Sequence, residues 1–189
     1  MASLIKSYDK QITPEVSKAL RGIDFQATFD HVKLWFDALI ESCPYEPDTI
    51  ALYFGMYDAA PDDDIPYEYT QLYLDGSSKY SENDEGEWAG YCSWTEESDY
   101  RYPNVPAMQE IGKLCSSISN ACNFSFSQAF AACLIIELVP TIVRTLDFQR
   151  HARYPITLGH DSGDLYLLGY LTPDGLDKPQ IPYSFFYRK

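Results

Sequence analysis

Strict alternation of side-chain type marks the stretch Thr49-Ile50-Ala51-Leu52-Tyr53-Phe54-Gly55-Met56-Tyr57. Successive side chains of a β-strand point to opposite faces of the sheet, so this period of two predicts a strand. One face of that strand carries Ile50, Leu52, Phe54 and Met56. The other face carries Tyr53 and Tyr57.

Two further strands follow this one along the chain. Residues 67–74 form the second, with Tyr67, Tyr69 and Tyr73 on one face, and the Asp75-Gly76-Ser77-Ser78 stretch is predicted to be a turn. A polar loop then leads to a third strand over residues 88–95. Short connections of this kind are typical of an antiparallel meander.

A second group of strands lies near the end of the sequence. Residues 154–159 and 164–171 flank His160-Asp161-Ser162-Gly163, which is predicted to be the turn of a β-hairpin. We expect Asp161 to hydrogen-bond its own backbone there. The aromatic tail, residues 183–187, is expected to add an edge strand or to cover one.

Helical periodicity surrounds the strands. Thr13 and Pro14 predict the start of a short helix that Gly22 ends. Apolar residues three or four apart predict helices over residues 28–43 and 104–119. After a break at residues 120–123, Ser125 or Ser127 is expected to cap a long apolar helix, kinked or ended by Pro140 and continued over residues 142–148.

The order of elements therefore predicts an α+β fold. We expect one antiparallel sheet, made of a three-strand meander plus a C-terminal hairpin, packed against helices on one face. The 189 residues are enough for one domain with its own core, so residues 1–189 are expected to form a single domain.

The cellular location is predicted from what the sequence lacks. The first residues contain no apolar signal segment, and the longest apolar run, residues 129–139, is too short to span a bilayer. Cys115, Cys122 and Cys133 are expected to be reduced core residues. Together these features predict a cytoplasmic protein with no membrane contact.

Acidic residues are concentrated in one part of the chain. The net charge is −14, and thirteen of the 28 acidic residues lie between Asp58 and Asp99, where Lys79 is the only basic residue. This field repels nucleic acid and attracts a basic protein surface. The same region is rich in Tyr and Trp, which are favoured at protein interfaces.

We therefore predict a partner-binding face on the meander. It comprises Asp62, Asp63, Asp64, Glu68, Tyr69, Tyr73, Glu82, Asp84, Glu85 and Trp94. The alternative is that the aromatic residues are sheet core and that the acidic residues belong to solvated loops.

No catalytic residue, metal site or cofactor is predicted. The His160-Asp161-Ser162 run lies in a hairpin turn rather than a nucleophile elbow, and three adjacent residues do not easily form a relay. Acidic surroundings would raise the pKa of Cys92 and weaken it as a nucleophile. The Asp62-Asp63-Asp64 run lacks the Gly that a calcium loop requires.

The acidic, Tyr-rich strands from Tyr53 to Trp94 and the hairpin over residues 155–169 resemble bacterial immunity proteins of polymorphic toxin systems. Those proteins are small, acidic, cytoplasmic α+β proteins that bind and block a toxin domain. The resemblance implies a non-enzymatic inhibitor with a basic toxin or effector as its partner. Two alternatives stay open, a small-molecule-binding or hydrolytic domain with a pocket at the sheet, and a general protein-interaction module.

Overall fold

The computed structural model describes residues 12–83, 86–95, 101–116, 118, 120–177 and 185–186. Its strands form one sheet in the order β3-β2-β1-β4-β5-β6, and β7 also pairs with β5. The strands are β1 Ala51–Ala59, β2 Tyr69–Ser77, β3 Cys92–Thr95, β4 Tyr154–His160, β5 Leu165–Thr172, β6 Gly175–Asp177 and β7 Phe185–Phe186. The helices are α2 Pro14–Gly22, α3 Phe25–Ser42, the short 3-10 helix η1 Glu87–Gly90, α4 Pro106–Cys115 and α5 Asn120–Val143.

The predicted α+β fold is confirmed, with one difference in strand pairing. The meander β1-β2-β3 and the hairpin β4-β5 are both antiparallel, as expected. The two units are joined through β1 and β4, which run parallel, with Leu52 opposite Ile156. The chain between β3 and β4 passes through α4 and α5 before it returns to the sheet, so β4 enters in the same direction as β1.

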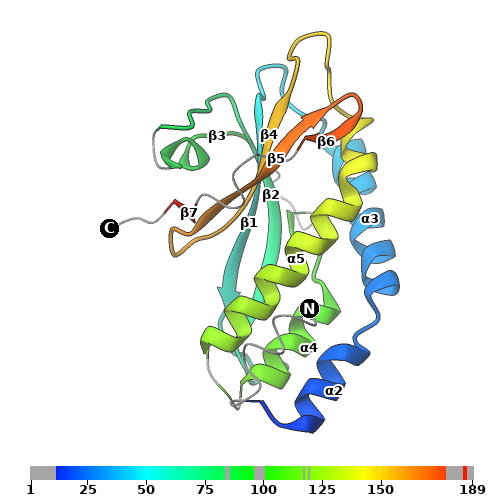
Figure 1. Cartoon of the computed structure of the whole chain (residues 1–189), viewed down its shortest axis with the longest axis vertical. Coiled ribbons are helices and arrows are strands. Elements are labelled where there is room, and N and C mark those ends of the chain that lie inside the picture. Colours follow the sequence, from blue (N-terminus) through cyan, green and yellow to red (C-terminus); the bar gives the residue numbers. More distant parts are fainter. Residues whose placement is uncertain are drawn as a thin grey trace.

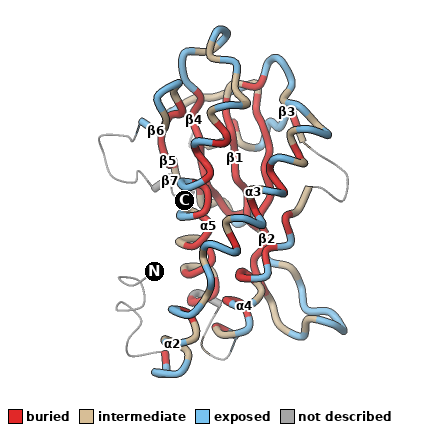
Figure 2. The backbone as a smooth tube through the Cα atoms, turned by 90° about the vertical axis from the view of Figure 1, so that its right-hand side faces the viewer, coloured by how far each residue is buried: buried red, intermediate tan, exposed pale blue. Residues whose placement is uncertain are grey.

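The two faces of the sheet are covered by different structures. Leu52, Phe54 and Met56 are fully buried in a large core shared with the helices, which lie along one side of the sheet (Figure 1). The opposite face carries a smaller cluster around Tyr53, Tyr73 and Trp88, covered by the β2–β3 connection. The strands between these layers are buried along most of their length (Figure 2).

The first two helices begin where side-chain caps are available. Thr13 accepts a hydrogen bond from the Val16 amide at 3.3 Å, which confirms the predicted start of α2. The predicted start of the second helix at Thr28 was wrong, because α3 begins at Phe25. Asp24 accepts a hydrogen bond from the Ala27 amide at 3.0 Å and so caps the helix one turn earlier.

The long apolar helix begins and ends earlier than predicted. The break at residues 120–123 was wrong, because α5 starts at Asn120. Ser127 does not cap the helix, since its hydroxyl donates to Asn123 Oδ1 at 3.2 Å inside the first turns. Beyond Pro140 the helix stops at Val143 rather than running to residue 148, and the following turns use bonds such as Arg144 N–H to Thr141 O.

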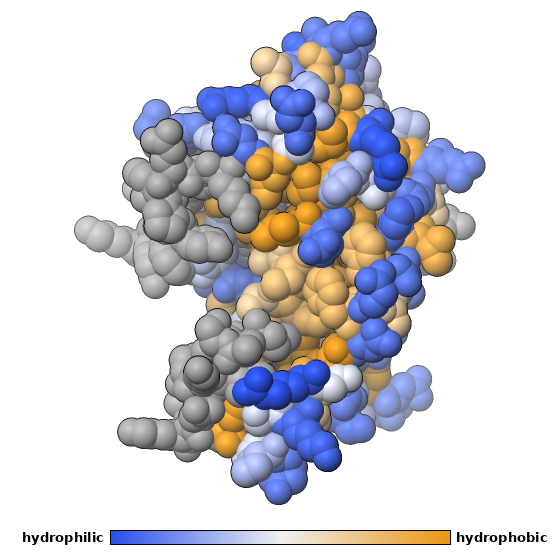
Figure 3. All heavy atoms as spheres, turned by 45° about the vertical axis from the view of Figure 1, so that its right-hand side comes forward, coloured by the Kyte–Doolittle hydropathy of each residue, from blue (hydrophilic) through white to orange (hydrophobic). Residues whose placement is uncertain are grey.

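α5 is also long and apolar enough, over Cys122–Val143, to cross a membrane by those two criteria. Of its 18-residue apolar window, 56% is buried inside the protein, as expected for the core helix of a folded domain. Figure 3 shows an apolar band on the side that carries α5, with hydrophilic residues along its right-hand margin. Ile136 and Cys133 are exposed, so the prediction that Cys133 is a core residue was wrong.

The second and third strands also differ from the predicted ranges. Most of the turn expected at residues 75–78 is strand instead, since β2 continues to Ser77, where β3 pairs Thr95 with Asp75 and Trp94 with Gly76. The third strand is shorter than predicted, and Trp88 lies in η1, ahead of β3. The polar side chain of Asp75 is tolerated in a buried strand because Thr95 of the neighbouring strand donates a hydrogen bond to it at 2.9 Å.

Candidate functional site

A pocket of about 320 Å³ lies on the tyrosine-bearing face of the sheet. Four segments of the chain build it: the strands β1 and β2, the η1–β3 region, and the β4–β5 turn. The lining residues are Tyr53, Tyr73, Asp75, Gly86, Ala89, Gly90, Cys92, His160, Asp161, Gly163, Asp164 and Leu165. This volume is at the lower end of the range for ligand sites, so it suits a side chain or a small molecule.

Two tyrosines form the floor of the pocket. Tyr53 and Tyr73 meet edge to face, with ring centroids 5.9 Å apart, and the Tyr73 ring lies across Gly55 of the neighbouring strand. Tyr73 donates a hydrogen bond to Asp161 Oδ1 at 2.7 Å. Burial raises the pKa of Tyr53 to about 12 and is also the main cause of the raised pKa of Tyr73. Both hydroxyls are therefore protonated at neutral pH, and that of Tyr73 donates to Asp161.

Asp75 is the most buried carboxylate of the pocket, with 3% of the residue exposed. It accepts hydrogen bonds from Thr95 Oγ1 at 2.9 Å and from the Cys92 thiol at 3.4 Å. Arg101 Nη2 lies 3.5 Å from its Oδ2. Burial raises the pKa of Asp75, and the Thr95 bond and the Arg101 charge oppose that rise.

The predicted β4–β5 hairpin turn is present, but one of its expected contacts differs. Gly163 N–H donates to His160 O at 2.8 Å, and Gly163 has a positive φ of 108°, as a tight hairpin turn requires. The prediction that Asp161 bonds its own backbone was wrong. Its amide donates to Met56 O at 2.9 Å, and its carboxylate reaches Tyr73 instead. His160 takes the local role, since its Nδ1 accepts from Ser162 N–H at 3.1 Å.

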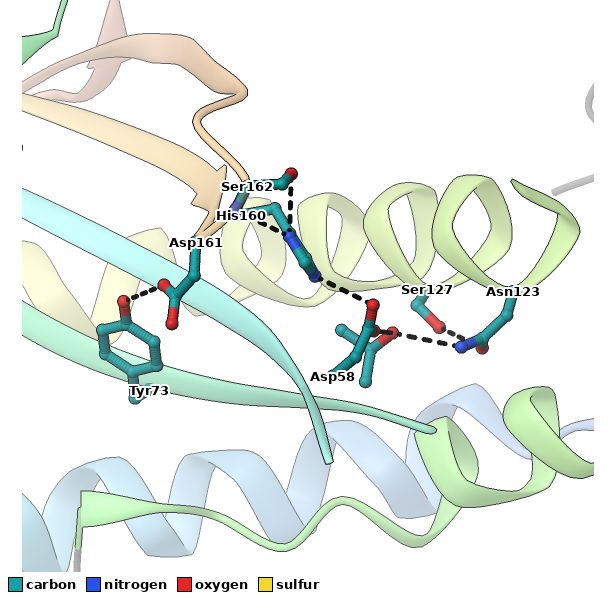
Figure 4. A network of polar contacts seen from close by, with 8 residues as sticks. Asp58, Tyr73, Asn123, Ser127, His160, Asp161 and Ser162 are labelled. Carbon is teal, nitrogen blue, oxygen red and sulfur yellow. Dashed lines mark hydrogen bonds and ion pairs between the residues drawn. The ribbon is translucent and has the colours of Figure 1, made fainter. Parts of the chain in front are cut away.

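His160 and Asp161 are adjacent but point to opposite faces of the sheet (Figure 4). On the helix side, His160 Nε2 lies 3.4 Å from Asp58 Oδ2. Asp58 also accepts from Thr70 Oγ1 at 3.0 Å, and Thr70 in turn accepts from Asn123 Nδ2 at 3.5 Å. The contact with His160 is the main cause of the lowered pKa of Asp58. This chain of contacts joins the turn, the sheet and α5.

The arrangement of Ser162, His160 and Asp58 does not make an activated nucleophile. Ser162 Oγ lies 3.0 Å from His160 Nδ1, but the amide of the same serine already donates to that nitrogen. Because the Nδ1 lone pair is occupied, the neutral ring carries its proton on Nε2, facing Asp58. Imidazole in this state holds the turn and has no free basic nitrogen to receive the hydroxyl proton.

Cys92 is held as a thiol. Burial, followed by the charge of Asp75, raises its pKa to about 11, which agrees with the direction expected from its acidic surroundings. Its S–H donates to Asp75. Among the residues that the structure describes, no three His, Cys, Asp or Glu side chains come together in a group that could hold a metal ion.

The acidic residues of the β1–β2 loop are placed as surface residues. Asp63 and Asp64 are exposed. Asp62 is exposed too, but its carboxylate accepts hydrogen bonds from the amides of Asp64 at 2.9 Å and Ile65 at 2.7 Å, so it shapes the loop. Glu68 is half-buried.

The aromatic residues assigned to the binding face are buried. Tyr69 and Tyr73 are each 8% exposed, and Tyr73 forms the pocket floor. Trp94 is 3% exposed and belongs to the core on the helix side, where its ring nitrogen donates to Cys43 O at 3.2 Å. Trp94 is therefore placed away from the pocket.

Glu82 has a partner within the chain. It accepts a hydrogen bond from the Tyr170 hydroxyl of β5, while Tyr80 lies 3.2 Å from the same hydroxyl and Arg153 stacks on the Tyr170 ring at 4.1 Å. These contacts hold the β2–β3 connection against the tyrosine-bearing face of the sheet. Asp84 and Glu85, also assigned to the binding face, lie outside the described residues.

Sequence reasoning missed three carboxylates that line the pocket. Asp161 and Asp164 were assigned to a hairpin, and Asp75 to a turn. The sequence did contain one signal for these residues, because each lies at or near the end of a predicted strand. It did not show that β4 pairs with β1, which is the contact that brings the hairpin turn to the pocket.

No protein-family model, curated protein or solved structure matches this chain. The geometry of the described residues is therefore the basis for a functional assignment.

Proposed function

We propose that this chain is a non-enzymatic binding protein that captures a basic protein partner, in the manner of an immunity protein that blocks a toxin or effector. The observation that carries the proposal is the excess of carboxylates on the tyrosine side. Asp75, Asp161 and Asp164 line one pocket, and in the described part of the chain only Asp75 has an ion-pair partner there, Arg101. A basic surface would relieve that excess.

The exposed β1–β2 loop adds to this charge. Asp63 and Asp64 are free to steer a partner, since charges at the rim of an interface mainly raise the association rate. The buried tyrosines support the pocket from within. The proposed surface is therefore the pocket plus the acidic loop, and it no longer includes Trp94.

A hydrolytic pocket is the second candidate, and one observation favours it. His160, Cys92 and carboxylates line a single pocket, which is the kind of set that hydrolysis uses. The contacts favour binding instead. Cys92 donates to Asp75, and His160 faces Asp58 on the other side of the sheet.

Charge reversal tests the proposal. The full chain, with the product of a neighbouring gene as the trial partner, is used in pull-down at low and high salt and then in affinity measurements. Asp63→Lys combined with Asp64→Lys is expected to weaken binding at least about tenfold at low salt. Asp62 is kept because it shapes the loop.

The matched control is Glu110→Lys combined with Glu137→Lys. Both residues are exposed on helices, α4 and α5, so this variant changes the net charge equally while the β1–β2 loop keeps its sequence. Equal weakening by both variants would show that only net charge matters. Capture of no basic partner at either salt would contradict the proposal.

A further inference from the structure

The pocket already holds one guanidinium group at its edge. Arg101 Nη2 lies 3.5 Å from Asp75 Oδ2, and its guanidinium carbon lies 5.2 Å from the centre of the Tyr73 ring and 5.6 Å from that of Tyr102. Only 29% of the Arg101 side chain is exposed. A carboxylate and tyrosine rings of this site therefore bind a guanidinium within the chain itself.

The carboxylates on the opposite wall have no such partner. Asp161 receives the Tyr73 hydroxyl, and Asp164 follows it in the same turn. No ion pair to either side chain occurs within the described ranges. Within the described ranges, three carboxylates thus line the pocket of about 320 Å³, and one of them, Asp75, has a guanidinium partner.

We propose that this pocket binds the guanidinium of an arginine side chain presented by the basic partner, with Asp161 and Asp164 as its carboxylate acceptors and the tyrosines beside it. The inference rests on the proposed function and names the group that the site recognises. It assigns recognition of the partner's arginine to the β4–β5 hairpin turn and not to the acidic β1–β2 loop.

The chemistry of the lining favours a guanidinium over other ligands. Anions would be repelled by three carboxylates. A planar guanidinium stacks on aromatic rings and bonds carboxylates through two N–H groups at once, whereas an ammonium is a compact, strongly hydrated charge. At the same site Arg101 lies over the Tyr73 ring and within ion-pair distance of Asp75.

The experiment uses agmatine, which carries the arginine side-chain group on a small molecule, in calorimetric titrations of the full chain at low salt. Because agmatine also carries a primary ammonium, putrescine, which has two ammonium groups and no guanidinium, is the matched cationic probe, and N-butylurea is the neutral probe. We expect agmatine to bind, and putrescine and N-butylurea each to bind at least about tenfold more weakly, because the pocket recognises a planar charged group. Equal binding of agmatine and either control probe, or no binding of agmatine, would overturn the inference.

The test variant is Asp161→Asn combined with Asp164→Asn. Asparagine keeps an oxygen that can accept the Tyr73 hydroxyl, so the floor of the pocket is preserved while two charges are removed. We expect agmatine affinity to fall at least about tenfold. Asp174→Asn is the control, since Asp174 is exposed in the β5–β6 turn outside the pocket, and it is expected to leave affinity unchanged.

The same variants in the partner assay separate the two proposals. If Asp63→Lys with Asp64→Lys weakens capture but the pocket variant does not, partner binding stands and the arginine site falls. If agmatine binds through Asp161 and Asp164 but no basic partner is captured, the pocket stands and the inhibitor function falls.

Discussion

The two faces of the sheet bury their side chains by different means. On the helix side, the sheet contributes aliphatic and aromatic residues such as Phe54 that are fully buried under α3, α4 and α5. On the other side, Tyr53 and Tyr73 are 8% exposed under an irregular connection that is fastened by polar contacts. Apolar burial stabilises the first face, and the second face keeps space, charge and hydrogen-bonding groups for a ligand.

The largest expected effect is the loss of stability when a buried side chain on the helix side is truncated. Phe54→Ala on the helix side should lower the free energy of unfolding by about 3–5 kcal/mol, because it leaves a cavity in a closed core. Urea denaturation followed by circular dichroism measures this loss. A loss below about 1 kcal/mol would mean that the helix side is not the main source of stability.

Gly55→Ala tests whether β1 must have glycine at the position where the Tyr73 ring of β2 lies across it. An added Cβ would overlap that ring, so we expect a loss of about 1–3 kcal/mol and weaker agmatine binding. Gly90→Ala is the control, because Gly90 also lines the pocket but has open space around it, and it should change stability by less than about 0.5 kcal/mol. In the Gly55→Ala/Tyr73→Ala double variant, the two effects should not be additive.

Tyr170→Phe tests whether the Tyr170 hydroxyl holds the β2–β3 connection in place. Loss of the hydroxyl removes its bond to Glu82 and should cost about 0.5–1.5 kcal/mol. Hydrogen exchange is expected to rise in residues 86–92, which cover the tyrosine face, and not in α5. Unchanged exchange in residues 86–92 would show that other contacts hold this connection.

The smallest expected effects concern pH, and they have opposite signs on the two faces. Contact with His160 lowers the pKa of Asp58, so its contribution to stability is present above the usual aspartate value of 3.8 and is lost as pH falls through the lowered pKa. Burial raises the pKa of Asp75, so its ionisation reduces stability as pH rises from 3.8 through the raised pKa.

Unfolding measured across this pH range in two variants tests these signs. Asp58→Asn should remove the loss of stability at low pH, whereas Asp75→Asn should remove the loss at higher pH. The same pH dependence in both variants would contradict the assignment of opposite environments to the two aspartates.

Local patterns predicted the elements of the helix side well. Alternation in residues 49–57 predicted both faces of β1, and the Thr13 cap predicted α2, because strand period and capping depend on neighbouring residues. Boundaries failed where a distant partner decides them. Asp75 stays in a strand because Thr95 of β3 bonds it, and residues 120–123 are helical, with Asn123 bonded to Thr70 of β2.

The sequence by itself determined an α+β domain with an aliphatic and a tyrosine-bearing sheet face, and it determined where the negative charge is concentrated along the chain. Only the tertiary structure decided which of those charges come together. The parallel pairing of β4 with β1 brings Asp161 and Asp164 to a pocket lined by Tyr53, Tyr73 and Asp75. Pairing between strands about a hundred residues apart depends on packing of the whole core, and no local periodicity encodes it.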